Sequence, residues 1–469
     1  MRSRAIIGSN PHLRFPSSFT IALMKITHSV TFAALAIIGV ISISHAEEAK
    51  ALSPSPLKPA VSDLPFIISY WWGPPMQETT LERYKEIAEA GFNVAMPAST
   101  TGKTPPDENE AHNRKFLDLC KQVGIKGVIA DSAMPYGDGD KMAAPKPEEI
   151  PAIQKSLDSI IEKYSAHPAL LGYFVTDEPP VATFARTGLI TQYLLKKDPK
   201  HLPYTNILPN YAGGDGGQWS KPKYEGTVAK YIEEVKPTLM SWDHYRQMMG
   251  GGDESGYWQN LEVMRKLCTK SGIPYIQIIV SLKHMGYREC SEADLRWQVY
   301  TSLAFGSRGI MYFTYWDVKG LAWADAPAII TMDGKRDKKY DYVKKINTRI
   351  AKLGPTLTKL VCTGAYCNAP LPPDGVPLSA DAPVKKIDGG RIVVGCFQDS
   401  GDKRYIFPVN RTVNKIITAK LTLDETAESV SEVSQETGEL LPPTPLTDGT
   451  LELKLQPGDG QLFLINKKK

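Results

Sequence analysis

The sequence predicts an α/β protein, a (β/α)8 TIM barrel followed by a small C-terminal β-sandwich, from three observations. Eight short apolar runs alternate with amphipathic helical patterns between residues 65 and 358, as a barrel of this kind requires. No Gly-x-Gly-x-x-Gly or P-loop motif follows an early run, as an open doubly wound sheet would need. Beyond residue 359 the helical patterns give way to short strand patterns separated by Pro, Gly and Asp.

The expected barrel strands are short apolar runs that end in glycine, proline or polar residues. They span residues 66–72, 92–96, 127–131, 170–176, 203–209, 238–245, 275–280 and 309–316. The helices that follow them carry apolar residues on one face, and several end at a glycine. They span residues 80–90, 109–123, 150–164, 185–196, 227–235, 257–271, 292–305 and 341–353.

The C-terminal segment predicts antiparallel strands, because several of its runs alternate apolar and polar residues with a period of two. The clearest runs span residues 391–397, 405–410, 415–419, 451–455 and 461–465. A small β-sandwich over residues 359–469 accounts for them. This segment has no cluster of acidic residues, so we expect it to pack against the barrel rather than to carry the chemistry.

The overall composition excludes several classes of protein. Of the 469 residues, 42% are hydrophobic and 23% charged, which is typical of a globular chain and not of a disordered one. The formal net charge is +4 and the lysines are dispersed, so the sequence predicts no nucleic-acid binding. The chain is long enough for two or three domains, and its sequence indicates no particular oligomeric state.

The N-terminus has the residue order of a secretory signal peptide. Met24-Lys25 precedes an apolar run over residues 30–43, which ends in Ser44-His45-Ala46. The run is shorter than the roughly 20 residues of a membrane-spanning helix, which favours cleavage after Ala46 over an uncleaved anchor. We therefore expect a secreted or periplasmic protein with no other membrane contact. Its expected parts are a signal peptide (1–46, with the true start at Met24), a linker (47–63), the barrel (64–358) and the sandwich (359–469).

The six cysteines have neither the density of a disulfide-stapled scaffold nor the spacing of a zinc site. Cys362 and Cys367 are close enough in sequence for a local bridge in an oxidising compartment. Buried free thiols are the alternative expectation for most of the cysteines.

The most informative stretch is 170–180, in which a short apolar run ends abruptly in Asp177-Glu178-Pro179-Pro180. The prolines stop further strand pairing, so the two acids should lie where the strand opens into a loop. In a barrel this carboxyl end of the strand is where catalytic residues lie. The structural alternative is an Asp that caps the next helix beside a solvated Glu.

Polar and aromatic residues recur at the ends of the other expected strands. Because the carboxyl ends of barrel strands converge on one mouth, these side chains should face a common cavity. Acids beside Trp and Tyr suit carbohydrate chemistry, since aromatic faces stack on sugars while carboxyl groups transfer protons. We expect catalytic roles for Glu178, Asp177 and Asp243. The expected substrate-binding residues are Tyr70, Trp71, Trp72, Asp131, Asn206, His244, Tyr245, His284 and Trp316.

Each of these residues has a structural alternative. A single Trp is more often a core residue, Asp131 can cap or hydrogen-bond its neighbours, and His244 can be a structural histidine. Asp131 and His244, together with Asp243 and His284, could ligate a divalent ion, but they lack His-x-x-x-His spacing. We therefore expect no metal and no cofactor.

These motifs resemble the clan A glycoside hydrolases, and in particular the barrel and β-domain of the family 42 β-galactosidase-like proteins. The resemblance extends over about residues 65–467, and its matching segments are 70–72, 172–179, 241–245, 295–306, 309–316 and 457–463. It implies an exported hydrolase of O-glycosidic bonds in a poly- or oligosaccharide, with Glu178 in the position of the general acid/base.

Two departures from the family pattern leave the mechanism open. Asp177-Glu178 replaces the family's Asn-Glu at strand four, and Ser281-Leu282-Lys283-His284 follows strand seven, where the family has a nucleophilic Glu. Glu289 and Glu292 lie a loop further on, and Glu292 is expected to cap the helix after Ser291.

Three interpretations follow. Asp243 is the second carboxylate, with a separation from Glu178 of roughly 5 Å for retention or 6.5–9.5 Å for inversion. Alternatively, Asp177 and Glu178 act together on a substrate that supplies its own nucleophile, as in barrels resembling the hexosaminidases. In the third interpretation the barrel binds carbohydrate without turnover.

Overall fold

The computed structural model describes residues 64–98, 105–136, 143–251, 256–318 and 327–468. The predicted signal peptide (1–46) and linker (47–63) lie outside the described residues. Within the described ranges, no helix is long and apolar enough to cross a membrane.

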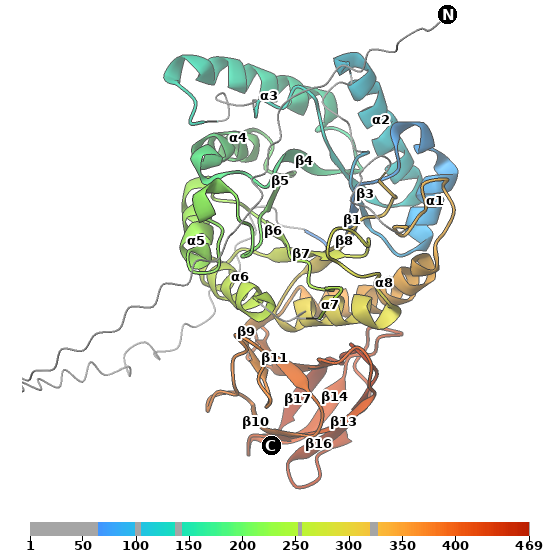
Figure 1. Cartoon of the computed structure of the whole chain (residues 1–469), viewed down its shortest axis with the longest axis vertical. Helices are drawn as coiled ribbons and strands as arrows, with labels where there is room; N and C mark the ends of the chain where they lie inside the picture. The colour runs from blue at the N-terminus through green and yellow to red at the C-terminus, as the bar shows by residue number, and fades with distance from the viewer. Residues whose placement is uncertain (1–63, 99–104, 137–142, 252–255, 319–326, 469) are drawn as a thin grey trace, which may run out of the picture. The chain divides into compact units, whose positions relative to one another are not determined.

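Eight parallel strands form one curved sheet with helices around its outside, so the predicted TIM barrel is confirmed (Figure 1). Neighbouring strands pair in the order β1-β8-β7-β6-β5-β4-β3-β2. The strands are β1 (Ile67–Trp71), β2 (Val94–Ala95), β3 (Lys126–Ile129), β4 (Leu170–Asp177), β5 (Leu202–Ile207), β6 (Met240–Asp243), β7 (Tyr275–Val280) and β8 (Gly309–Phe313).

The helices cover the outer face of this sheet because each carries an apolar side. They are α1 (Leu81–Glu89), α2 (Pro106–Val123), α3 (Ile150–Tyr164), α4 (Phe184–Lys197), α5 (Tyr224–Val235), α6 (Tyr257–Ser271), α7 (Glu292–Ala304) and α8 (Lys338–Leu357). Gly124 and Gly272 end α2 and α6 in the left-handed region, with φ of 77° and 67°. Short 3-10 turns lie in the connections: η1 (Met76–Glu78), η3 (Pro147–Glu149), η4 (Val181–Thr183) and η5 (Asp215–Gly217).

One side chain bridges β1 and β2 in place of a ladder of backbone bonds. Asn93, immediately before β2, accepts a hydrogen bond from Ile68 N on its Oδ1 (2.8 Å) and donates one from its Nδ2 to Phe66 O (2.7 Å). Its backbone N–H also donates to Ile68 O (3.1 Å). An amide side chain offers both a donor and an acceptor, so it satisfies strand backbone as a neighbouring strand would. The ring of strands is therefore continuous between β1 and β2.

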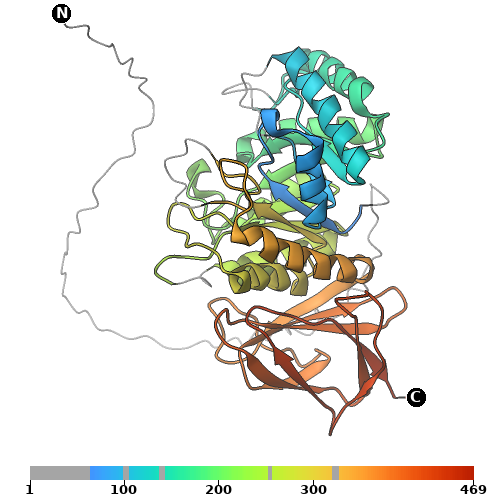
Figure 2. The same ribbon diagram turned by 90° about the vertical axis from the view of Figure 1, so that its right-hand side faces the viewer.

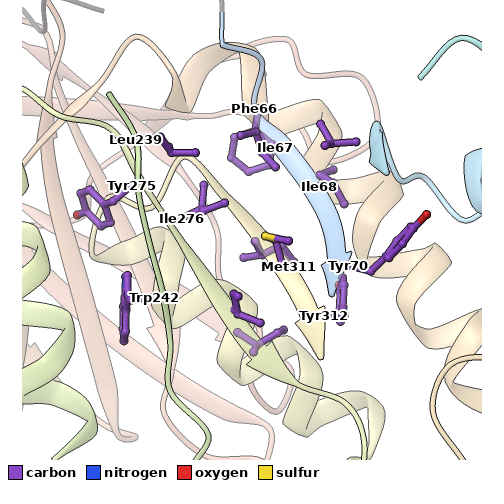
Figure 3. Packing of buried hydrophobic residues seen from close by; sticks show 14 of the residues in the cluster. Phe66, Ile67, Ile68, Tyr70, Leu239, Trp242, Tyr275, Ile276, Met311 and Tyr312 are labelled. Atoms are coloured by element: carbon purple, nitrogen blue, oxygen red, sulfur yellow. The ribbon is translucent and has the colours of Figure 1, made fainter. Parts of the chain in front are cut away.

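Apolar side chains of the strands form the barrel core. Figure 3 shows buried side chains of β1, β7 and β8 packed together, among them Ile67, Ile276 and Met311. Such close packing holds the strand ends at fixed positions.

The C-terminal part forms the predicted β-sandwich, with two antiparallel sheets facing each other (Figure 2). One sheet has the order β10-β13-β16 and the other β15-β14-β17-β12-β11-β9. The strands are β9 (Val361–Cys367), β10 (Val384–Asp388), β11 (Ile392–Gln398), β12 (Arg404–Asn410), β13 (Ile417–Leu423), β14 (Ala427–Glu432), β15 (Thr444–Pro445), β16 (Thr450–Leu455) and β17 (Phe463–Lys467). Their inward-facing residues form a second apolar core.

All six cysteines are buried free thiols. The local bridge between Cys362 and Cys367 does not form because both residues lie on β9, which is extended. Five strand residues span roughly 16 Å, well beyond the Cα separation that a disulfide can bridge.

Helix α7 is buried on nearly all sides because it packs against the barrel on one face and the sandwich on the other. Arg296 Nε donates to Pro457 O (3.0 Å), and Tyr300 OH donates to Gln435 Oε1 (2.8 Å). A side chain at Gly395 would collide with Ala304 O on this helix. The predicted packing role of the C-terminal segment is consistent with these contacts.

Candidate functional site

Two acids lie at the carboxyl end of β4, as the sequence predicts. Asp177 is the last residue of the strand, and Glu178 follows it with a φ of 47°, in the left-handed region that non-glycine residues rarely adopt. The Glu178 N–H donates to Asn206 O on β5 (2.9 Å), which holds this strained residue in place. Both residues have an exposed surface. Their carboxyl groups nevertheless have many protein atoms around them, which disfavours the ionised form.

A third acid joins them from β6. Asp243 is only 5% exposed, and its carboxyl group is hydrogen-bonded to that of Glu178. Asn206, at the end of β5, donates from Nδ2 to Asp177 Oδ1 (3.2 Å) and to Asp243 Oδ1 (3.1 Å). One amide group therefore links the acids of β4 and β6.

The orientation of the Asn206 amide is fixed by its neighbours inside the barrel. Ser241 Oγ donates to Asn206 Oδ1 (3.1 Å), and Tyr204 OH lies 2.7 Å from Ser241 Oγ. Because Oδ1 is the acceptor of this bond, the Nδ2 group must face the two carboxyl groups.

Burial and mutual repulsion raise the pKa of all three acids. Burial, with the charge of Glu178 adding to it, raises the pKa of Asp177 to about 7. Burial raises the pKa of Glu178, although the hydrogen bond from Asp243 opposes this rise. The pKa of Asp243 lies well above its ordinary value because burial and the neighbouring charges of Glu178 and Asp177 disfavour its ionised form. The three acids therefore hold their protons to a higher pH than isolated carboxyl groups do.

An open cleft of about 240 Å³ lies beside these acids. It is lined by Trp71, Trp72, Met96, Pro97, Ala98, Ala130, Phe174 and Asp177. The ring of Trp71 meets that of Phe174 at 5.6 Å between centroids and 62° between planes. Aromatic and aliphatic side chains thus form most of the wall, and Asp177 provides its acidic group.

Aromatic side chains also lie on the β6 and β8 side of the acids. Tyr245 stacks on Phe313 at 5.3 Å between centroids, and its ring meets the edges of His284 (5.9 Å) and Tyr287 (5.7 Å). Tyr287 OH donates to Tyr211 OH (3.3 Å). His284 Nδ1 donates to Leu282 O (2.8 Å), which fixes the ring. The charges of Asp243, Glu178 and Asp177 act on the Tyr245 hydroxyl, which places these rings near the acids.

Two predicted aromatic residues lie in other surroundings. Tyr70 is fully buried between Phe92 and Tyr315, at 5.2 and 4.8 Å between ring centroids. The Arg83 guanidinium lies over the ring of Trp316 at 4.7 Å from its centroid. The Tyr70 ring thus packs beside Phe92 and Tyr315, and the Trp316 ring packs beside Arg83 of α1. Neither residue is among those that line the cleft.

Two predicted polar residues are held by neighbouring helices. Asp131 accepts from Tyr164 OH (2.8 Å) and from Ala133 N (2.8 Å), so its carboxyl group faces α3. His244 Nδ1 donates to Asn260 Oδ1 on α6 (2.8 Å). Burial lowers the pKa of His244 to about 3, so its ring is neutral.

Several residues at the site were not predicted. Phe174 lines the cleft, Tyr204 and Ser241 hold Asn206, and Tyr211 and Tyr287 contact the Tyr245 ring or backbone. Tyr204 and Ser241 each lie two residues before a predicted site residue on the same strand face, so strand alternation could have identified them. Tyr211 and Tyr287 lie in loops, where no sequence periodicity indicates which way a side chain points.

The end of β7 provides no carboxyl group. Ser281 N and Leu282 N both donate to Phe313 O (2.8 and 3.0 Å). Glu289 pairs with Lys338 (2.9 Å) on the side of α8. Glu292 does not cap α7 as predicted. Ser291 and Asp294 form the capping box, and Glu292 pairs instead with Arg296 (2.5 Å) across one turn of the helix.

Among the described residues, no group of three or more His, Cys, Asp or Glu side chains has the geometry of a metal site. The acids at the mouth are instead held by an amide and by each other. This arrangement can donate, accept and store a proton.

Comparisons with known proteins identify the fold. No protein-family model and no curated protein sequence match this chain. The solved structures of Gan42B, a GH42 β-galactosidase from G. stearothermophilus, and of its catalytic mutant match with TM-scores of 0.56 and 0.55. They share 9% and 8% identity with this chain, and each match covers 88% of this chain and 100% of the other. A family 5 glycoside hydrolase from Bacteroides vulgatus matches with a TM-score of 0.51 and 11% identity, over 86% of this chain and 90% of the other. The chain therefore has the TIM barrel fold of these enzymes.

We predict that Asp177→Asn raises the melting temperature at pH 8, by about 2 °C or more, and leaves it unchanged at pH 4. The folded-state pKa of about 7 exceeds that of an unfolded chain, so proton binding stabilises the fold below about pH 4 and is lost as the pH rises through 7. Asn removes the ionisable group but keeps an acceptor for Asn206. Differential scanning calorimetry at both pH values measures the effect, with exposed Asp381→Asn as control. Equal melting temperatures at pH 8 would contradict the raised pKa.

Proposed function

We propose that this protein is an exported glycoside hydrolase that cleaves O-glycosidic bonds of a poly- or oligosaccharide, with Glu178 as the general acid/base. The observation that carries the proposal is the hydrogen-bonded pair Glu178–Asp243 at the barrel mouth, beside Asp177 and an aromatic cleft. The fold shared with a β-galactosidase and a family 5 glycoside hydrolase supports it by analogy.

Cleavage of a glycosidic bond requires a proton for the leaving oxygen and a negative group near the developing positive charge on the sugar. A carboxyl pair that shares one proton offers both, a neutral acid and an anion, at neutral pH. Glu178 is exposed, whereas Asp243 is buried and held by Asn206. Glu178 therefore delivers the proton, and Asp243 acts as a positioning residue that sets the proton affinity of Glu178.

The second catalytic group is constrained by exposure. Asp243 is 5% exposed, so it is poorly placed to reach a sugar as a nucleophile or base. Asp177 opens onto the aromatic cleft, and the end of β7 has no carboxyl group. These features favour the interpretation in which Asp177 and Glu178 act together on a substrate that supplies its own nucleophile.

The end of β7 also favours a second candidate function, a carbohydrate-binding barrel without turnover. In such a protein the aromatic side chains still stack on a sugar, but no nucleophile completes the reaction. It would bind a sugar saturably and release no product from any glycoside.

We expect Glu178→Gln to lower the rate of phenol release from an unsubstituted phenyl glycoside by about 10³-fold, because this poor leaving group requires the proton donor. A panel of 4-nitrophenyl glycosides, with and without a 2-acetamido group, identifies the substrate. Circular dichroism checks the fold, and Glu82→Gln on the exposed face of α1 is the matched control. Full activity of Glu178→Gln would show that Glu178 is not the acid. Sugar binding without any turnover by the wild-type protein would establish the second function.

Export is proposed from residues 24–46, whose order is that of a signal peptide. We expect the protein recovered from the periplasm or medium to begin at Glu47, which intact-mass spectrometry measures. Recovery in the cytoplasm with the N-terminal segment intact would contradict export.

A further inference from the structure

The described side chains that line the cleft beside Asp177 are mainly apolar. The walls of the cleft come from Trp71 and Trp72 after β1, Met96 and Pro97 after β2, and Phe174 on β4. Among the described lining residues, only the carboxyl group of Asp177 and the two indole N–H groups can form strong side-chain hydrogen bonds.

The described part of this lining suits a flat apolar ring better than a fully hydroxylated sugar ring. Hydroxyl groups around the edge of such a ring would lose water and face Met96, Pro97 and Phe174, which cannot replace those hydrogen bonds. A flat apolar ring has no hydrogen bonds to water that it would lose against the same walls. The Trp71 and Phe174 rings meet in an edge-to-face arrangement, which offers such a ring one aromatic face and one aromatic edge.

The cleft has a volume of about 240 Å³ and opens to solvent, so it has room for a group as large as a substituted aromatic ring. The one carboxyl group, Asp177, marks the end at which a polar linking atom can lie.

We propose that this cleft binds an aromatic leaving group, so that the substrate is an aryl glycoside whose phenolic oxygen lies beside Asp177 and Glu178. The proposal deepens the function proposed above and rests on it. In the reaction, the Glu178 proton passes to the phenolic oxygen as the bond between that oxygen and the anomeric carbon breaks. Water then supplies the hydroxyl group of the free sugar and returns a proton to Glu178.

Binding of 4-nitrophenol tests the cleft without requiring turnover. We expect saturable binding to the wild-type protein by isothermal titration calorimetry, about tenfold weaker binding to Met96→Gln because it buries an unpaired amide, and unchanged binding to Met332→Gln. Met332 is an exposed methionine in the β8–α8 connection, so it controls for the same chemical change elsewhere. Ala130→Leu, which narrows the cleft, should weaken binding in the same way. Absence of saturable binding, or equal binding to all four proteins, overturns the proposal.

Kinetics then distinguish the leaving group from the sugar. For the sugar that supports turnover, Met96→Gln should lower kcat/KM at least tenfold for the 4-nitrophenyl glycoside and less than twofold for the methyl glycoside. The intrinsic reactivity of each leaving group cancels because variant and wild type are compared on the same substrate. Equal losses on both substrates overturn the proposal. If no glycoside is turned over but 4-nitrophenol binds as expected, the hydrolase assignment fails while the aromatic site stands.

Discussion

The site depends on one constraint, the crowding of three carboxyl groups at the mouth of the barrel. Asp177, Glu178 and Asp243 would repel one another if each carried a charge, and burial adds to that cost. The protein relieves the repulsion in two ways. Glu178 and Asp243 are hydrogen-bonded to each other, and the Asn206 amide donates to Asp177 and to Asp243. A cluster held in this way has a proton available near neutral pH, which is what a general acid requires.

The barrel places these groups through the register of three adjacent strands. Asp177 on β4 lies opposite Asn206 on β5, and Asn206 lies opposite Ser241 on β6. Asp243 lies two residues beyond Ser241, on the same face of its strand. Asn93 and the packed core keep the ring of strands in shape, while α7 joins it to the sandwich. The body of the barrel therefore stabilises the fold, and its mouth carries the candidate catalytic groups.

Much of this arrangement could be predicted from the sequence, because strand and helix periodicity extends over the whole barrel. The position of Asp177 and Glu178 followed from an apolar run that stops at two prolines. The direction of individual side chains was harder to predict. Trp71 reaches the cleft whereas Tyr70, its neighbour on the strand, faces the opposite side, and Trp316 lies beyond the end of β8, where the chain approaches Arg83. The contact between Glu178 and Asp243 depends on strand register and on the positive φ of Glu178, neither of which a residue pattern specifies.

The shared proton is the claim on which the proposed chemistry rests, and infrared difference spectroscopy tests it most directly. Spectra of the wild-type protein and Asp243→Asn at pH 7 compare the carboxyl region with the fold unchanged. In the difference between the two spectra we expect the C=O stretching band of a protonated carboxyl group that the wild type has in excess of the variant, shifted in D2O. A wild-type spectrum in which this difference shows only ionised carboxylate bands would contradict the account.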